Sequence, residues 1–249
     1  MPAALKPDEY VDYPLRYEDQ YGVVDTVCHS NGRELALTLR GRTFRGGGFS
    51  VLDVDGSDIA DLPKDQFPVD QYGGLKGCFT LTLPVPVIGS TNSSAVVVIS
   101  FDYRDGANLI NSTLTADGIS YQAVHKDDAE SCLISLQRQL PEGMFLACCL
   151  SCRWSHYWPG GNGDFGNLGC FVAWPGAAGI ASKIDTFHAW DDARRHDQVV
   201  QMQETWSCPL FRLIQPGEWA YKDWDWAVQA PSRPDGSTRT SGNRDILSD

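Results

Sequence analysis

The sequence predicts an α+β protein, in which an N-terminal antiparallel β-sandwich and a helix precede an irregular C-terminal region stapled by zinc. Alternating apolar residues, leucines at helical spacing and a late group of four cysteines predict these parts in turn. We expect residues 1–126 to form the sandwich. Residues 127–228 are expected to hold the helix, the cysteine-rich zinc-binding region and a second helix, and 229–249 a disordered tail, since they are polar and lack aromatic side chains.

Short strands separated by turn signals characterise the N-terminal half. Leucines recur at every second residue along 34–40, directly after an Asn-Gly pair at 31–32 that readily adopts the positive φ of a hairpin turn. Apolar residues alternate again along 79–83, and 109–124 has the pattern of a hairpin with an Asp-Gly turn. Residues 46–75 lack this periodicity and are expected to form a long loop or two short edge strands. Several short strands with regular turns are typical of a sandwich.

The first helix is expected to begin near Asp127 or Asp128, either of which can cap it. Leucines recur at helical spacing from 133 to 140, and Pro141 ends the pattern. The apolar run that follows, 144–150, resembles a buried strand. It leads the chain into the cysteines.

A second helix is expected to begin at Ser182, because Ser182 and Asp185 have the spacing of a capping box, with aspartate in the place of glutamate. Its buried stripe would consist of Ile184, Phe187 and Trp190. The stretch 155–179 before it contains seven glycines and two prolines. We expect that stretch to be irregular.

Charge and composition argue against several classes of protein. The chain has 20 basic and 32 acidic residues and a formal net charge of −12. A surface of this sign repels phosphate backbones and anionic lipid, so we expect neither nucleic acid nor a membrane as partner. The N-terminal residues show no apolar segment of signal-peptide length, and no run of about 18 apolar residues occurs. We therefore expect a cytoplasmic protein.

Four of the eight cysteines could form a zinc site, although a second C-x-x-C pair is missing. Cys149 and Cys152 form a C-x-x-C pair, whose two thiolates can bind one ion. Cys170 lies beyond the glycine-rich loop, and Cys208 precedes a proline after the second helix. Zinc prefers tetrahedral thiolate ligands and would order a loop that is poor in aliphatic residues. We predict a structural zinc ion bound by Cys149, Cys152, Cys170 and Cys208.

The residues leave alternatives open at this site. The cysteines can instead be small buried side chains, or Cys149 and Cys152 can form a redox pair, although the glycine-rich sequel does not suit a thioredoxin-like motif. Cys148 or His156 can replace one of the four ligands. Four thiolates close the coordination sphere, so a catalytic zinc ion requires one of these cysteines not to be a ligand.

Three motifs mark residues 130–220: Cys149-x-x-Cys152-x-Trp154-Ser155-x-Tyr157-x-Pro159-x-Gly161, Phe165-Gly166-x-Leu168-x-Cys170-Phe171 and Gln203-Glu204-Thr205-Trp206-x-Cys208-Pro209. They resemble the motifs of an uncharacterised bacterial family, a domain of unknown function. The resemblance implies a shared fold and the same four cysteines, and it implies no activity. The chain departs from the family pattern at His156, where an aspartate is expected, which argues against an acidic role there.

These observations favour a non-enzymatic, zinc-stabilised binding protein. Bacterial immunity proteins are often small, acidic and poor in motifs, because they act by surface complementarity, and their charge steers a basic partner. We therefore expect a protein partner and an immunity or inhibitor role. The alternative is a zinc-dependent hydrolase with Glu204 or His156 as general base. A four-cysteine module that grips nucleic acid is a third possibility, against which the charge speaks.

Overall fold

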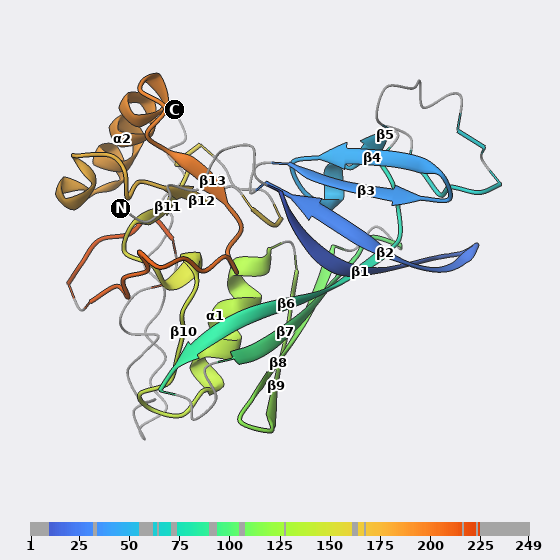
Figure 1. Cartoon of the computed structure of the whole chain (residues 1–249), viewed down its shortest axis with the longest axis horizontal. Helices are drawn as coiled ribbons and strands as arrows, with labels where there is room; N and C mark the ends of the chain where they lie inside the picture. The colour runs from blue at the N-terminus through green and yellow to red at the C-terminus, as the bar shows by residue number, and fades with distance from the viewer. Residues whose placement is uncertain are drawn as a thin grey trace, which may run out of the picture.

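The structure is a computed structural model that describes residues 10–31, 34–54, 62–63, 65–70, 74–89, 94–104, 108–126, 128–160, 164–166, 168–215, 217–222 and 224. The described part contains a large antiparallel sheet, a small sheet and two α-helices (Figure 1). The predicted α+β class is confirmed. Within these residues no helix has the length and apolar character needed to span a bilayer. The predicted tail, 229–249, lies outside the described residues.

The large sheet is built mainly from strands that follow one another in the sequence. Its order is β5-β4-β3-β2-β1-β6-β7-β8-β9, and β10 pairs with β6. Each of these pairings is antiparallel. The strands are β1 (Val11–Asp19), β2 (Gly22–Ser30), β3 (Leu35–Leu39), β4 (Arg42–Gly46), β5 (Asp53–Val54), β6 (Cys78–Ile88), β7 (Ser94–Asp102), β8 (Leu109–Ala116), β9 (Ile119–Lys126) and β10 (Phe145–Leu146).

Alternating apolar residues place one face of the long strands in the core. The pattern is clearest in β6, where every second side chain from Phe79 to Val87 is buried. These side chains are Phe79, Leu81, Leu83, Val85 and Val87. The period of two in the sequence therefore reflects strands with one buried face.

The structure has one continuous hydrogen-bonded sheet in place of the predicted sandwich of two sheets. β1 pairs with β2 on one side and with β6 on the other, so the hydrogen bonding has no break at which two separate sheets could form. Phe49, from the 3₁₀ turn η1 (Phe49–Val51), packs on Phe79 and Phe101, with ring centroids 5.1 and 4.9 Å apart. Loop side chains such as Phe49 thus cover core surface that a second sheet would cover in a sandwich.

Two tight turns contain residues in the left-handed region. Arg40 and Gly41, with φ of 47° and 77°, join β3 to β4, and Asp117 and Gly118, with φ of 49° and 78°, join β8 to β9. Positive φ at both central residues matches the right-handed twist of the flanking strands. The second turn is the predicted Asp-Gly turn. The turn predicted at 31–32 lies partly outside the described residues, although β2 and β3 on either side of it pair antiparallel.

The first helix, α1 (Ala129–Gln139), begins and ends where the sequence predicts. The Asp128 carboxylate caps it by accepting the backbone N–H of Ser131 at 2.5 Å. Leu140, which precedes Pro141, is the C-terminal cap. The helix packs on β8 and β9 and buries Leu133 and Leu136 completely.

A small antiparallel sheet organises the C-terminal region. It consists of β11 (Ser155–Tyr157), β12 (Leu168–Cys170) and β13 (Val200–Met202), with β12 in the middle. The prediction that 155–179 is irregular was therefore wrong for β11 and β12. Strands of three residues are too short to show a periodic pattern, so the sequence contained no signal for them. The strand predicted at 144–150 is reduced to β10, followed by a turn.

The second helix, α2 (Lys183–Arg195), confirms the predicted start. The Ser182 hydroxyl accepts the backbone N–H of Asp185 at 3.1 Å. The Asp185 carboxylate accepts the N–H of Ala181 at 3.2 Å, rather than that of Ser182 as in a standard capping box.

The stripe predicted for α2 is correct at only one position. Trp190 is fully buried, whereas Ile184 is 69% and Phe187 43% exposed. The buried residues of the helix are Thr186, Ala189, Trp190 and Ala193. The Trp190 ring lies on Gly169 of β12, where an added Cβ would come within 2.4 Å of it. A glycine in a distant strand therefore helps to set which face of the helix is buried.

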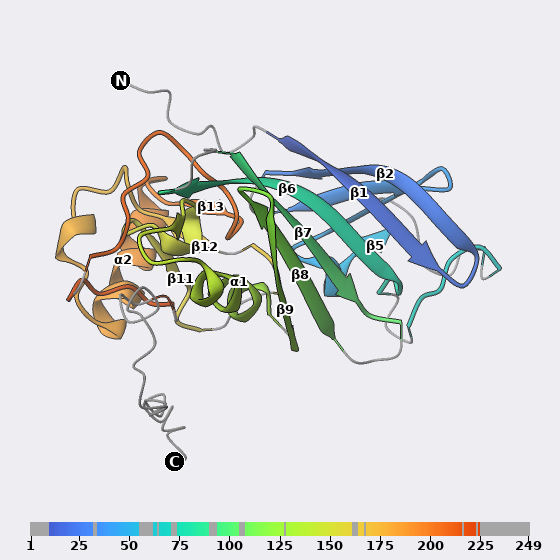
Figure 2. The ribbon, with the colours of Figure 1, turned by 90° about the horizontal axis from the view of Figure 1, so that it is seen from below.

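One buried cluster joins the N-terminal and C-terminal parts of the chain, whose C-terminal elements lie at one end of the long strands (Figure 2). Phe165 packs between them, with ring centroids 5.5 Å from Phe101 and 6.2 Å from Phe49. The boundary between 126 and 127 stays a prediction, and the buried cluster continues across it.

Candidate functional site

Segments far apart in the sequence bring four cysteines together. The first segment is the 3₁₀ turn η3 (Cys149–Ser151), which ends at Cys152. The N–H of Cys152 donates to the carbonyl of Cys149 at 3.1 Å, so the chain folds back between these two residues. The N–H of Cys149 donates to the carbonyl of Trp206 at 2.6 Å, and Cys152 forms a β-bridge with Leu213. These contacts place the turn against the segment that contains Cys208.

The small sheet supplies the third segment. Cys170 of β12 lies opposite Ser155 of β11, so the two side chains share a face of the sheet. The Ser155 hydroxyl donates to the carbonyl of Cys149 and contacts that of Cys152 at 3.1 Å. The turn η3 also packs on β12. Cys170 therefore faces the turn that holds Cys149 and Cys152.

Backbone N–H groups approach two of the thiols. The chain turns directly after Cys208, and the N–H of Phe211 donates to the Cys208 carbonyl at 3.0 Å. Backbone N–H groups of Leu210 and Phe211 also interact with the Cys208 sulfur, and that of Val172 with the Cys170 sulfur. Such N–H groups favour a negatively charged sulfur.

Burial and mutual proximity raise the pKa values of Cys149, Cys170 and Cys208. Burial raises the pKa of Cys149 well above its usual range, and the thiols of Cys170, Cys152 and Cys208 add to this effect. Burial raises the pKa of Cys170 to about 11, with further contributions from Cys152 and Cys208. Burial likewise raises the pKa of Cys208, and Cys152 contributes. The four thiols are electrostatic neighbours, so their charged forms disfavour one another unless a cation compensates.

All eight cysteines are free thiols. In the part of the chain that the structure describes, no three His, Cys, Asp or Glu side chains form a group that could hold a metal ion. Electrostatic effects act over longer distances than a zinc–sulfur bond of about 2.3 Å. The thiols are thus neighbours that do not form a closed coordination shell.

Lys222 binds backbone carbonyls within the thiol cluster, which consists of Cys149, Cys152, Cys170 and Cys208. Its ammonium donates to the carbonyls of Cys149 at 3.1 Å and Cys152 at 2.6 Å and contacts the Ser155 hydroxyl at 2.7 Å. Burial lowers the pKa of Lys222 to about 8, and the neighbouring thiols oppose this shift. Ser155 is 1% exposed, so its contact with Lys222 is buried.

Arg153 is a second cation beside the cluster. It is 5% exposed, and its Nη1 atom has no hydrogen-bond partner among the described residues. Burial lowers the pKa of Arg153, while Glu218, 3.6 Å from its Nε atom, and the thiol of Cys152 oppose the shift. Lys222 and Arg153 together place positive charge where thiolates would otherwise be unfavourable.

The two alternative ligands differ in their placement. His156 follows Ser155 in β11, so its side chain points to the face of the small sheet opposite Cys170. Its Nδ1 atom accepts the N–H of Tyr221 at 3.1 Å, and its ring packs edge-on against Phe171. The Cys148 sulfur accepts backbone N–H groups at the start of η3 and lies near Cys149. Cys148 therefore stays an open alternative, and the placement of His156 does not favour it as a ligand.

Glu204 is held by two hydrogen bonds. Its Oε1 atom accepts the Tyr157 hydroxyl at 2.8 Å and its Oε2 atom accepts the N–H of Gly166 at 2.7 Å. The side chain is 1% exposed, and burial raises its pKa to about 8. Both carboxyl oxygens are thus engaged inside the protein.

Sequence reasoning did not identify the cations of the cluster. Lys222 lies 70 residues from Cys152, and no spacing rule relates the two positions. Ser155 and Tyr157 do stand within the first of the three motifs, which was the available signal for the polar contacts around the cysteines.

Residues 11–155 match the model of a family of unknown function, DUF6304. The chain belongs to this family. The expectation of an uncharacterised family is confirmed. The DUF6304 match extends over the large sheet, α1, Cys149 and Cys152, whereas the likeness expected from the sequence lies mainly within 130–220 and covers the β-rich half only by pattern. The DUF6304 match ends before Cys170 and Cys208. No curated protein and no solved structure matches the chain.

Proposed function

We propose that this member of DUF6304 is a non-enzymatic binding protein whose C-terminal region is stabilised by zinc. The ligands would be Cys149, Cys152, Cys170 and Cys208. The observation that carries the proposal is the convergence of these thiols from η3, β12 and the segment after β13. Zinc binding would require the four side chains to turn inward to bond lengths of about 2.3 Å.

The surrounding charges support a thiolate site. Four thiolates around a divalent cation carry two excess negative charges, which are costly to bury without compensation. Lys222 and Arg153 supply two positive charges beside the cluster. The N–H groups that approach Cys170 and Cys208 act in the same direction.

The positions of His156 and Glu204 support a structural zinc ion more than a catalytic one. The hydrolase alternative needs a base beside an open coordination position. His156 lies on the opposite face of the small sheet from Cys170, and both oxygens of Glu204 accept internal hydrogen bonds. The net charge of −12 suits a basic protein partner, as in an immunity or inhibitor protein that acts by surface complementarity.

X-ray absorption spectroscopy of the zinc-loaded protein tests the structural reading against the hydrolase alternative. We expect a shell of four sulfur atoms at about 2.3 Å. A shell of three protein ligands with one light atom from water would contradict the structural reading and support the hydrolase.

Replacing a proposed ligand should release zinc and destabilise the C-terminal region. Wild-type protein is expected to contain about one zinc ion per chain, and Cys152→Ser and Cys170→Ser to lose it and to melt at lower temperature, because structural zinc contributes folding free energy. Metal analysis and thermal unfolding measure both effects. Cys78→Ser, at a partly exposed cysteine of β6, is the matched control and should retain zinc. Cys148→Ser should also retain it if Cys149 is the ligand. Wild-type melting of both ligand variants, or fully folded wild-type protein free of zinc, would contradict the proposal.

A further inference from the structure

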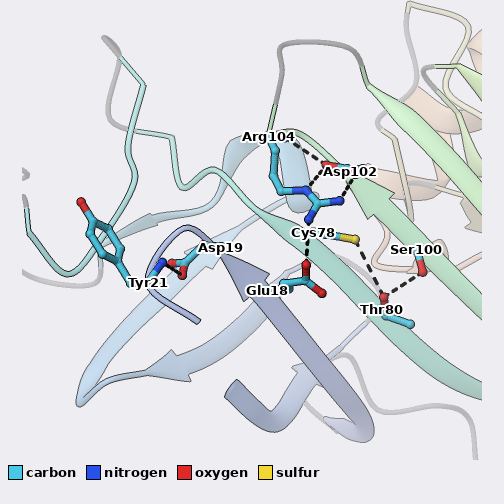
Figure 3. Close-up of polar contacts among 8 residues, drawn as sticks. All are labelled: Glu18, Asp19, Tyr21, Cys78, Thr80, Ser100, Asp102 and Arg104. Atoms are coloured by element: carbon cyan, nitrogen blue, oxygen red, sulfur yellow. Dashed lines mark hydrogen bonds and ion pairs between the residues drawn. The ribbon is translucent and has the colours of Figure 1, made fainter. Parts of the chain in front are cut away.

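Cys78 and Cys208 are the partly exposed members of the eight cysteines, and the other six are buried. Cys78 lies in β6 opposite Glu18 of β1 and Asp102 of β7. Figure 3 shows its sulfur near the Thr80 hydroxyl, 4.0 Å away, beside the ion pairs that Arg104 forms with Glu18 and Asp102. Its cross-strand neighbours are therefore carboxylates. Burial and Asp102 raise the pKa of its thiol.

Cys208 has a different environment, because the thiols of Cys149, Cys152 and Cys170 are its electrostatic neighbours. The N–H of Cys149 donates to the carbonyl of Trp206 at 2.6 Å, and Cys152 forms a β-bridge with Leu213, so the segment that contains Cys208 is held beside Cys152 at both ends. Besides burial, the Cys152 thiol raises the pKa of Cys208, and Cys208 in turn raises the pKa values of Cys149 and Cys170. A partly exposed cysteine thus lies in a segment held against the turn that contains the buried Cys152, and the two thiols are electrostatic neighbours.

We infer that Cys208 is a site of oxidative modification, at which a hydroperoxide starts the formation of a Cys152–Cys208 disulfide. In the first step the Cys208 sulfur attacks the peroxide oxygen, the O–O bond breaks, and sulfenic acid and one water form from hydrogen peroxide. In the second step the Cys152 sulfur attacks the sulfenic sulfur, and a second water leaves. Two sulfur atoms lose one electron each, and the peroxide is reduced to two waters.

The disulfide depends on the proximity of the thiols, and its effect on zinc rests on the proposed function. Zinc bound to Cys149, Cys152, Cys170 and Cys208 would lose two of its four ligands in this reaction. Oxidation would therefore release the ion and loosen the C-terminal region.

Peptide mapping of hydrogen peroxide-treated native protein tests the inference. The protein is treated in zinc-loaded form and after chelation, its free thiols are alkylated, and it is digested without reductant. We expect a linked peptide pair that contains Cys152 and Cys208, while Cys78 stays at least ten times more alkylated than Cys208. Alkylation of Cys208 to the same extent as Cys78, or a disulfide from Cys208 to a cysteine other than Cys152, would overturn it.

A variant and a metal readout separate this inference from the proposed function. Cys152→Ser should retain Cys208 as sulfenic acid, which dimedone labels, and the linked peptide should be lost. A chromogenic chelator should report zinc release from wild-type protein at the rate of disulfide formation. Zinc binding without the disulfide would overturn the inference alone. The disulfide in protein that binds no zinc would support the inference and overturn the proposed zinc site.

Discussion

At the scale of single residues, Glu204 is a buried acid that forms no ion pair with a cation within the described part of the chain. The Tyr157 hydroxyl and the Gly166 N–H bind its two oxygens, and Glu130, which is 7% exposed, acts on it as a like charge. Burial raises its pKa from 4.5 to about 8. The folded state therefore holds a proton on Glu204 that the unfolded state releases near pH 4.5.

Because of this pKa shift, the contribution of Glu204 to the stability of the fold decreases as the pH rises. The contribution of Glu204 is fully present below about pH 4.5 and is lost as the pH rises through about 8. We expect the free energy of unfolding of Glu204→Gln to fall less steeply with pH than that of wild type. The difference between the two proteins should grow by up to about 1.4 kcal/mol per pH unit between about pH 4.5 and 8. Urea unfolding from pH 5 to 9 measures the difference. Parallel curves for the two proteins would show that Glu204 does not titrate in this range.

At the scale of elements, α2 shows that capping follows local sequence and burial does not. The Ser182 cap forms as its spacing predicts, yet Ile184 of the predicted stripe is exposed. The ring centroid of Phe187 lies 5.0 Å from that of Trp158, at the edge of the buried face. Two of the three apolar residues that the period of 3.6 selected therefore lie at the surface.

Removing the cap should cost more than removing the exposed isoleucine. Ser182→Ala is expected to lower the free energy of unfolding by about 1 kcal/mol, because the Asp185 N–H loses its acceptor. Ile184→Ala in the same helix is the control and should change it by less than about 0.5 kcal/mol. Chemical unfolding measures both. A larger effect at Ile184 would indicate that this side chain is covered in solution.

At the scale of the whole molecule, Phe165 joins the C-terminal region to the large sheet. It is 1% exposed and packs on Phe101 of β7 and on Phe49 of η1. The cluster around it contains residues from β1 to Trp224. A core of this continuity favours one cooperative unit rather than two.

Removing this ring should destabilise the chain as one unit. Phe165→Ala is expected to lower the free energy of unfolding by about 3–5 kcal/mol, because it leaves a cavity among aromatic side chains. Phe187→Ala, at a phenylalanine that is 43% exposed, is the matched control and should cost much less. Calorimetry should show a single transition in wild type and variant. Two separate transitions would favour the division between 126 and 127.

The sequence by itself determined the features that depend on near neighbours. The caps at Asp128 and Ser182, the Asp-Gly turn of β8 and β9, and the alternation of β6 were all correct, because each depends on residues a few positions apart. The four cysteines could be proposed as one group because their residue type is rare and chemically distinct. The three-residue strands around them could not, because they are too short to show a period.

The tertiary structure decided what depends on distant partners. The pairing of β1 with both β2 and β6 decided between one ladder and a sandwich, and Gly169 beneath Trp190 helped to decide the buried face of α2. It also brought Lys222 to the carbonyls of Cys149 and Cys152. The burial of a side chain and the charges near it depend on which distant segments pack together. The local sequence pattern does not determine that packing.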